Sequence, residues 1–259
     1  MGERTKYPPG TFSWADLTTT DQDAAKTFYG QLFGWTAADQ PVGEGVYYSM
    51  MQENGKDVSA ISFQPQEQRD AGVPPTWNSY VTVESADSAV ERANELGATM
   101  HAPAFDVMTA GRMAVIQDPQ GAYFMVWEPK DHIGASLVNG HGRLSWNELA
   151  TNDMDASAKF YRDMFGWKTE PFDNPAMPYL IVQTADGRGQ GGIRPAQAQE
   201  PNYWLVYLGA DDIDATLAKA TELGANTLVG ATDIGAGKIA VLQDPQGAVF
   251  ALFGGQFEE

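Results

Sequence analysis

The chain has 259 residues, of which 43% are hydrophobic and 11% aromatic, so it is long enough for two domains with sizeable apolar cores. Its formal net charge of −18 argues against a nucleic-acid partner, because no basic stripe exists to neutralise phosphates. The acidic excess is compatible with a cationic ligand, although a solvated acidic surface is the simpler interpretation. Cysteine is absent, which excludes disulfides, thiol nucleophiles and thiolate metal sites. The polar N-terminal stretch and the lack of a long apolar run predict a cytoplasmic protein with no membrane partner.

The first half begins with a strand–helix–three-strand unit. Residues 11–17 alternate as a half-buried strand does, which places Phe12, Trp14 and Asp16 on one face. Asp21 is a suitable helix N-cap, an apolar stripe at i, i+3 and i+4 spacing follows it, and Gly34 suits the left-handed residue that ends a helix. The three further strands are predicted over 35–37, 46–51 and 58–63.

The same order of elements follows from residue 76. The predicted strand, helix and three strands cover, in order, 77–83, 85–96, 100–103, 113–117 and 122–128. The last two strands flank the turn sequence Asp-Pro-Gln-Gly. Asp118 can bond back onto this turn, Pro119 presets φ, and Gly121 accepts a positive φ, so the stretch predicts a β-hairpin.

The second half repeats the first. Residues 145–167 match residues 13–35 at 12 of 23 positions, and residues 237–248 match residues 111–122 at nine of twelve. We therefore predict an α+β chain of four βαβββ modules in two tandem pairs. The expected boundaries are a first domain over 8–130, a polar, Gly-rich linker over 131–142 and a second domain over 143–257.

The repeated motifs resemble those of the vicinal oxygen chelate superfamily, which includes glyoxalases, bleomycin resistance proteins and extradiol dioxygenases. The matching residues are Asp21-x6-Phe28-Tyr29-x3-Phe33-Gly34-Trp35, its copy in the second half, and the two Asp-Pro-Gln-Gly turns. The resemblance covers nearly all of residues 10–255. It implies two glyoxalase/bleomycin-resistance-like domains with curved mixed sheets, each shaped into a cup that holds a ligand or metal. It implies little about the reaction, because the fold hosts many unrelated activities.

Enzymes of that superfamily usually hold a divalent metal with His, Glu or Gln side chains inside the cup. One ligand lies seven residues before the aspartate that starts the helix, another on the first strand of the second module, and a glutamate four residues after the turn glycine. The corresponding positions here are Trp14, Trp77 and Met125 in the first half, and Trp146, Trp204 and Ala251 in the second. None is an ordinary metal ligand, so no metal residue and no cofactor are predicted, and a divalent metal is disfavoured.

Three residues are candidate catalytic groups. Asp16 and Glu148 occupy equivalent positions two residues beyond Trp14 and Trp146, where each would act as a base or simply hydrogen-bond a neighbouring strand. His101 would be a proton acceptor at the rim of the first cup or a structural residue. The other two histidines, His132 and His141, lie in the predicted linker and are expected to be solvated.

Tryptophans at the ligand positions predict a cup lined by aromatic side chains, which would suit a flat aromatic or polycyclic molecule. The predicted ligand-binding residues are Trp14, Trp77, Met125, Trp127, Trp146, Trp204 and Tyr207. Tyr48 and Tyr179 would add to this lining if they face inward. The alternative is that the tryptophans are core residues that close the cup completely.

Two main functions follow from these patterns. The first is a metal-free binding protein of the glyoxalase/bleomycin resistance type, with a small natural product or antibiotic as its partner. The second is an enzyme of the same superfamily, an oxidoreductase or lyase that performs a hydroxylase, dioxygenase, lyase or isomerase-type step in secondary metabolism. An interaction protein that keeps only the fold is a third interpretation. The tandem duplication supplies the pairing that single-domain members obtain from a partner, so a monomer or a homodimer is expected.

Overall fold

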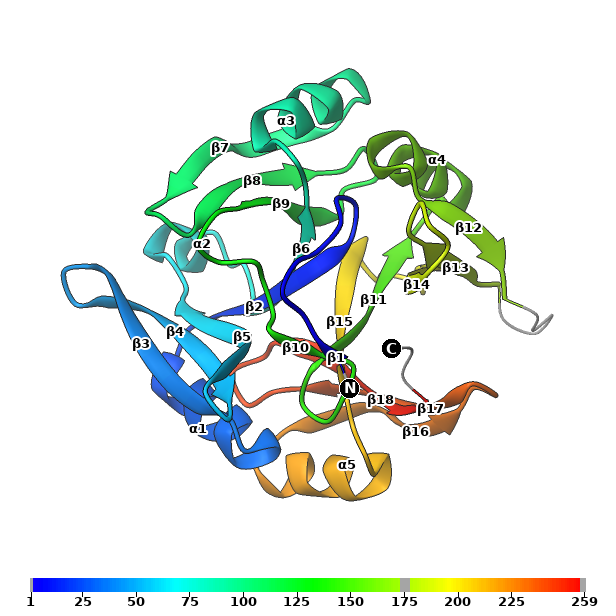
Figure 1. Cartoon of the computed structure of the whole chain (residues 1–259). Helices are drawn as coiled ribbons and strands as arrows, with labels where there is room; N and C mark the ends of the chain where they lie inside the picture. Colours follow the sequence, from blue (N-terminus) through cyan, green and yellow to red (C-terminus); the bar gives the residue numbers. More distant parts are fainter. Residues whose placement is uncertain (1, 173–177, 257–259) are drawn as a thin grey trace.

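The computed structural model describes residues 2–172 and 178–256 and contains two eight-stranded mixed sheets, one in each half of the chain (Figure 1). The strands of the first sheet are β2 (Phe12–Thr19), β3 (Thr36–Gly43), β4 (Val46–Glu53), β5 (Lys56–Phe63), β6 (Thr76–Thr82), β7 (Thr99–Val107), β8 (Gly111–Gln117) and β9 (Tyr123–Pro129). Those of the second are β11 (Leu144–Thr151), β12 (Lys168–Pro171), β13 (Leu180–Gln183), β14 (Gly189–Pro195), β15 (Tyr203–Gly209), β16 (Asn226–Asp233), β17 (Gly237–Gln243) and β18 (Val249–Gly255). The predicted tandem α+β fold is confirmed.

The strand orders of the two sheets are the same. The first is β3-β4-β5-β2-β6-β9-β8-β7, and the second is β12-β13-β14-β11-β15-β18-β17-β16. Within each module the first strand pairs in parallel with the last, and the two modules of one half join through the antiparallel pairs β2–β6 and β11–β15. Each cup is therefore built within one half of the chain, a question that the repeat alone left open.

Five helices and a short ribbon complete the described structure. The helices are α1 (Gln22–Phe33), α2 (Gln66–Asp70), α3 (Ala86–Glu95), α4 (Met154–Phe165) and α5 (Ile213–Glu222), and the ribbon pairs β1 (Gly2–Glu3) with β10 (Leu137–Val138). As predicted, the Asp21 side chain caps α1 by accepting a hydrogen bond from the Ala24 amide, and Gly34 ends it at φ 76°. Asp153 and Gly166 do the same for α4. None of the helices in the described part of the chain is long and apolar enough to cross a membrane.

The two sheets pack against each other through the faces that lie opposite their cups. One core cluster combines the first module with the fourth, and another combines the second with the third. Figure 1 shows the result, with α1 beside α5 and α3 beside α4. At the centre, the Ser79 hydroxyl on β6 donates to the Asn147 side-chain oxygen on β11 at 2.7 Å. Phe12 packs on Trp167 and Trp204, with ring centroids 5.2 and 5.0 Å away.

The Asp-Pro-Gln-Gly turns join strands as predicted and also hold the halves together. The first connects β8 to β9, with Gly121 at φ 104° and an Asp118 oxygen that accepts from the Gln120 and Ala122 amides. The other Asp118 oxygen accepts from the hydroxyl of Tyr161, on α4 of the second half, at 2.9 Å. In the second turn, Asp244 makes the reciprocal bond with Tyr29 of α1 at 3.0 Å.

Candidate functional site

A row of three side chains crosses the centre of each sheet on its cup face. In the first sheet, the strand register places Trp14 beside Tyr80, and Tyr80 beside Met125. The corresponding row of the second sheet consists of Trp146, Tyr207 and Ala251. The predicted cup positions on β2, β9, β11 and β18 are therefore occupied as expected. On β6 and β15 the cup position is occupied by Tyr80 and Tyr207, each three residues beyond the tryptophan that was predicted there.

Trp77 and Trp204, predicted to be ligand-binding residues, lie on the opposite face of their sheets. A shift of three residues along a strand reverses the side of the sheet that a side chain faces. The Trp77 indole donates to the Tyr29 hydroxyl at 3.0 Å, and Trp204 donates to Tyr161 at 2.8 Å. Both tryptophans are buried in the core between the halves. They stabilise the packing of the halves and line neither cup.

In the first cup, Asp16 lies at the centre of a closed hydrogen-bond network. One of its oxygens accepts from the hydroxyls of Tyr48 at 2.8 Å and Tyr80 at 2.9 Å, and the other accepts from the Asn78 amide at 2.8 Å. The Trp14 indole in turn donates to Tyr48 at 2.9 Å. Burial raises the pKa of Asp16, although the three donors oppose the shift. All these partners are protein groups, which is the arrangement expected for the structural alternative to catalysis.

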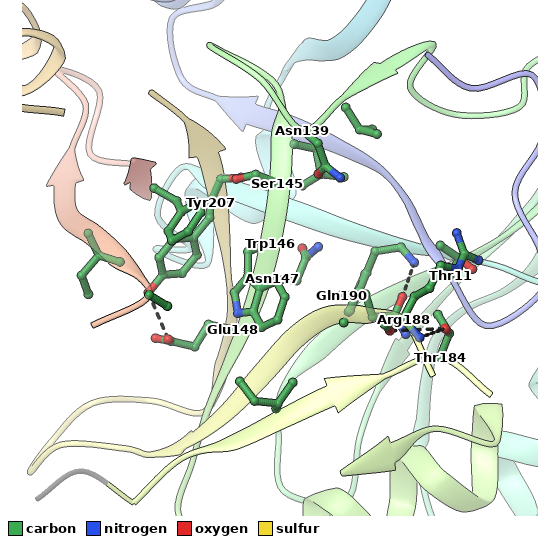
Figure 2. Close-up of a pocket in the computed structure, with 18 of the residues that line it drawn as sticks. Thr11, Asn139, Ser145, Trp146, Asn147, Glu148, Thr184, Arg188, Gln190 and Tyr207 are labelled. Carbon is green, nitrogen blue, oxygen red and sulfur yellow. Dashed lines mark hydrogen bonds between the residues drawn. The ribbon is translucent and has the colours of Figure 1, made fainter. Parts of the chain in front are cut away.

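In the second cup, Glu148 replaces Asp16 in a related network (Figure 2). One oxygen accepts from Arg194 Nε at 2.7 Å and the other from the Tyr207 hydroxyl at 3.0 Å. The Trp146 indole donates to Tyr179 at 3.0 Å, as Trp14 does to Tyr48. Burial, followed by the charge of Glu148, raises the pKa of Tyr207 well above its usual value. Tyr207 therefore remains a protonated hydrogen-bond donor at neutral pH.

The two cups thus repeat one constellation, an indole, two phenols and a carboxyl group. Tyr80 was missing from the predicted site, whereas its counterpart Tyr207 was included. The offset of 127 between Trp77 and Trp204 relates these tyrosines too, so the repeat contained the information needed to find Tyr80. Arg194 was also missed. Arg194 lies on β14, which pairs in parallel with β11, and strand pairing of this kind is not visible in a local pattern.

The linker closes the first cup. Trp14, Asp16, Tyr80, Met125 and Trp127 are all buried, and the linker residues Ala135, Leu137 and Val138 belong to the same core cluster. The amide of Ala135 donates to the Ser13 carbonyl at 2.8 Å, and the Trp127 indole donates to the His132 carbonyl at 2.8 Å. The predicted ligand-binding residues of this half, apart from Trp77, are therefore covered by the chain itself.

His132 is part of this cover, which corrects the prediction that it is solvated. Its ring centroid is 4.7 Å from that of Trp14 in an edge-to-face contact, and its Nε2 is buried with no hydrogen-bond partner among the described residues. Burial holds the pKa of His132 below its usual value, although the Asp57 carboxylate, 3.9 Å from Nδ1, opposes the shift.

We expect His132 to titrate below about pH 6.5, the midpoint of an unperturbed histidine. Because the folded pKa is the lower one, the folded state binds fewer protons, and the contribution of neutral His132 to stability is lost as the pH falls through that value. NMR of the His132 ring against pH measures the midpoint, with the protein in denaturant as the control. A folded-state midpoint equal to the denatured one would contradict the buried, neutral ring.

The second cup is open. It contains a cavity of about 570 Å³ whose wall includes Trp146, Glu148, Tyr179 and Tyr207. The N-terminal segment over residues 4–12 forms another part of the wall, together with side chains of β14, β16 and β17. Glu148 borders this space although its own exposed fraction is only 6%. The two halves thus have related inward residues, with Glu148 in place of Asp16 and Ala251 in place of Met125, but they differ in access. The linker covers the first cup and only borders the cavity of the second, through Val138 and Asn139.

His101 lies outside both cups. It is exposed on β7, its Nε2 is 3.0 Å from the side-chain oxygen of Gln117, and its ring packs on Tyr123 with centroids 4.6 Å apart. It does not line the cavity, so the structure gives it no place in a site with Glu148. The three predicted catalytic residues are therefore not brought together, and Glu148 is the one that borders open space.

The donor groups in the cups do not suit a bound metal. Over residues 2–172 and 178–256, no three His, Cys, Asp or Glu side chains converge on one point. In the open cup, both oxygens of Glu148 already accept hydrogen bonds from Arg194 and Tyr207. The neighbouring positions of the row hold indole, phenol and methyl groups, which are not ordinary metal ligands.

Comparison with known proteins matches both halves to related families. Residues 11–126 match the model of the Glyoxalase/Bleomycin resistance protein/Dioxygenase superfamily, and residues 147–253 match a glyoxalase-like domain. The "Putative glyoxylase CFP32" of Mycobacterium tuberculosis (strain CDC 1551 / Oshkosh) is 42% identical over 255 residues, which are 97% of either chain. The "Anthracycline biosynthesis protein DnrV" of Streptomyces peucetius is 31% identical over 274 aligned positions, covering 96% of this chain and 94% of that one.

Solved structures share the fold at low sequence identity. The Mn(II)-bound glyoxalase from Novosphingobium aromaticivorans aligns with a TM-score of 0.65 and 16% identity over 100% of this chain and 86% of its own. The 2,3-dioxygenase LapB from Pseudomonas sp. KL28 aligns with a TM-score of 0.63 and 12% identity over 96% and 93% of the two chains. At this identity the likeness concerns the architecture only.

Proposed function

Because the chain belongs to the glyoxalase/bleomycin resistance protein/dioxygenase superfamily, we propose that its second cup binds a small aromatic or polycyclic molecule without a metal. The observation that carries the proposal is the cavity of about 570 Å³ beside Trp146, at the position where the first cup is filled. This volume lies in the range typical of pockets for small organic ligands.

The wall of the cavity includes a group of aromatic side chains among aliphatic and polar ones. Trp146, Tyr179 and Tyr207 come from the second sheet, Phe12 from the first strand of the other half, and Phe253 from β18. Flat rings gain about 0.5–1.5 kcal/mol per aromatic pair beyond the burial of their area, so such a wall favours planar ligands over compact ones. The relatives named for anthracycline biosynthesis support a natural-product ligand from secondary metabolism.

Glu148 supplies the polar contact that orients the ligand. The Glu148 carboxylate has about four lone-pair sites, and Arg194, Tyr207 and Tyr179 engage three of them. It can therefore accept one more hydrogen bond, from a ligand hydroxyl or amine. A ring stacked on Trp146 with a hydroxyl at Glu148 would satisfy both the apolar wall and this acceptor.

Quenching of tryptophan fluorescence by a planar, non-fluorescent probe such as 2-(hydroxymethyl)anthraquinone tests the proposal. We expect saturable quenching that the substitution Trp146→Phe largely removes. Trp14→Phe is the matched control, because Trp14 has the equivalent position in the covered cup and donates to the equivalent tyrosine, Tyr48. Quenching that does not saturate, or that both variants change equally, would contradict a pocket beside Trp146. Stoichiometric iron, manganese, nickel or zinc in the purified protein would contradict metal-free binding.

A second candidate is an enzyme of the same superfamily in which Glu148 acts as an acid–base group, as its position beside the cavity would allow. Glu148→Gln separates the candidates. A binding protein keeps its affinity for the probe within a few-fold, whereas an enzyme loses turnover of a substrate while it still binds it. Asp16→Asn, in the covered cup, is the control for a general effect on folding.

A further inference from the structure

The wall of the open cavity has a charge opposite to that of the chain. Among the described residues that line it, four are basic (Arg4, Lys6, Arg188 and Arg194) and one is acidic, Glu148. The whole chain has 16 Lys and Arg against 34 Asp and Glu. The composition of such an acidic protein does not explain a positive wall. The net charge of the chain is compatible with a cationic ligand, but the positive wall of this cavity would repel one.

The excess of positive charge lies on the accessible part of the wall, where Lys6 and Arg188 are exposed and Arg4 is half-buried. Arg194 is neutralised at the floor, where it pairs with Glu148 at 2.7 Å and with Glu200 at 2.6 Å. Arg188 pairs with Asp186 at 3.1 Å, and both side chains are largely exposed. Glu148 is the acidic residue among the described residues of the wall, and it pairs with Arg194. In contrast, neither Arg4 nor Lys6 forms an ion pair with a described residue of the wall.

The fold holds these cations in place. The Arg4 amide donates to the Ser136 carbonyl at 2.9 Å, and the Tyr7 hydroxyl donates to the Ala135 carbonyl at 2.6 Å. The same linker that covers the first cup therefore anchors the N-terminal segment at the edge of the second. In Figure 1 this segment and β10 run side by side through the centre of the view.

The polar groups of the cavity are arranged at two ends. Figure 2 shows Glu148 and Tyr207 on one side of Trp146, and Thr11, Thr184, Arg188 and Gln190 on the other. A ring stacked on Trp146 would thus direct one edge to a hydrogen-bond acceptor and the other to donors and cations. Positive side chains on the accessible part of the wall also attract anions locally against the repulsion of the acidic surface.

From this arrangement we infer that the ligand carries an acidic group, such as a carboxylate, on the edge remote from Glu148, and that Arg4, Lys6 and Arg188 recognise it. The inference rests on the proposed function of the second cup and names the chemical class of its ligand. Exposed charge pairs are individually weak, about 0.2–1 kcal/mol, so each cation contributes about a 1.5- to 5-fold increase in affinity.

The experiment compares two probes of equal shape, anthraquinone-2-carboxylate and 2-(hydroxymethyl)anthraquinone, by the quenching that depends on Trp146. We expect the carboxylate to bind more tightly, and its advantage to shrink as the ionic strength rises from about 0.01 M to about 1 M. Arg4→Gln and Lys6→Gln should each weaken binding of the carboxylate by about 1.5- to 5-fold, with a larger loss for the double variant, and leave the alcohol unchanged. Lys219→Gln, an equal change of charge on an exposed lysine outside the cavity wall, is the control.

The outcomes separate the inference from the proposal beneath it. Equal affinity for the two probes, unaffected by Arg4→Gln and Lys6→Gln, overturns the acidic ligand and leaves the pocket intact. Absence of Trp146-dependent quenching by either probe overturns the proposed pocket and the inference with it. If Lys219→Gln weakens binding of the carboxylate as much as Lys6→Gln does, the preference for the carboxylate is a general effect of net charge. That result also overturns recognition by Arg4, Lys6 and Arg188.

Discussion

Replacement of Asp118 by alanine is expected to lower the free energy of unfolding by about 3–5 kcal/mol, although the residue lies in a turn far from the pocket. Asp118 is buried, and the substitution removes its hydrogen bonds to the amides of Gln120 and Ala122 and to the hydroxyl of Tyr161. The amides hold the hairpin, and the hydroxyl ties it to the other half. Loss of both leaves several buried donors without an acceptor.

Urea unfolding followed by far-UV circular dichroism measures this loss. Tyr161→Phe leaves the turn amides bonded to Asp118, but it removes the bond between the halves and the bond that the Tyr161 hydroxyl accepts from the Trp204 indole. We therefore expect a smaller effect of about 1–3 kcal/mol. Asp186→Ala is the matched control, because Asp186 is also a turn aspartate but is exposed, and its hydrogen bonds within the described chain go to the nearby Thr184 and Arg188. A loss below about 1 kcal/mol for Asp118→Ala would contradict the role assigned to the turn.

The second large effect is expected at Gly134, where the linker crosses the first strand. Gly134 has φ 108°, and an added Cβ would lie 2.4 Å from the carbonyl oxygen of Ser13. Both the strained backbone angle and the contact with main-chain atoms oppose any larger residue. Gly134→Ala should therefore cost about 3 kcal/mol of stability or displace the linker, which would uncover Trp14 and shift tryptophan emission to longer wavelength.

Gly187→Ala provides the comparison for Gly134→Ala. Gly187 also has a positive φ, of 92°, but an added Cβ there meets nothing within 4 Å. Its substitution tests the backbone strain alone and should cost about 1 kcal/mol with no change in emission. If the two substitutions had equal effects in urea unfolding, close contact of the linker with Ser13 would not be what constrains residue 134.

The features that the sequence predicted well are those determined within a few residues. Asp21 caps its helix and Gly34 ends it because both roles depend on local backbone geometry. The turn at Asp118 formed for the same reason, and the repeat carried each of these elements to the second half. What the local pattern did not contain is the partner of the second Asp118 oxygen, which lies 43 residues further along the chain.

The candidate site was predicted less completely because it depends on register and on tertiary cover. Trp77 was assigned to the cup, whereas the pairing of Trp14 with Tyr80 places the tyrosine there and the tryptophan on the other face. The Gly-rich composition of the linker suggested a solvated segment. Its small residues instead allow close approach to the first strand, as at Gly134. The path of the linker depends on tertiary contacts such as that between Ala135 and Ser13, which no pattern within either half contains.

The reciprocal bonds between Tyr29 and Asp244 and between Tyr161 and Asp118 have a consequence for how this chain can change over generations. Substitutions at these four positions should occur in compensating pairs that join opposite halves. Tyr29 depends on a turn residue encoded 215 codons away, and Tyr161 on one encoded 43 codons away. These pairs place no constraint on the side chains of the cup faces. One cup can therefore acquire a new ligand through mutation while the other serves only as support, which gives a duplicated gene room to diversify without loss of folding.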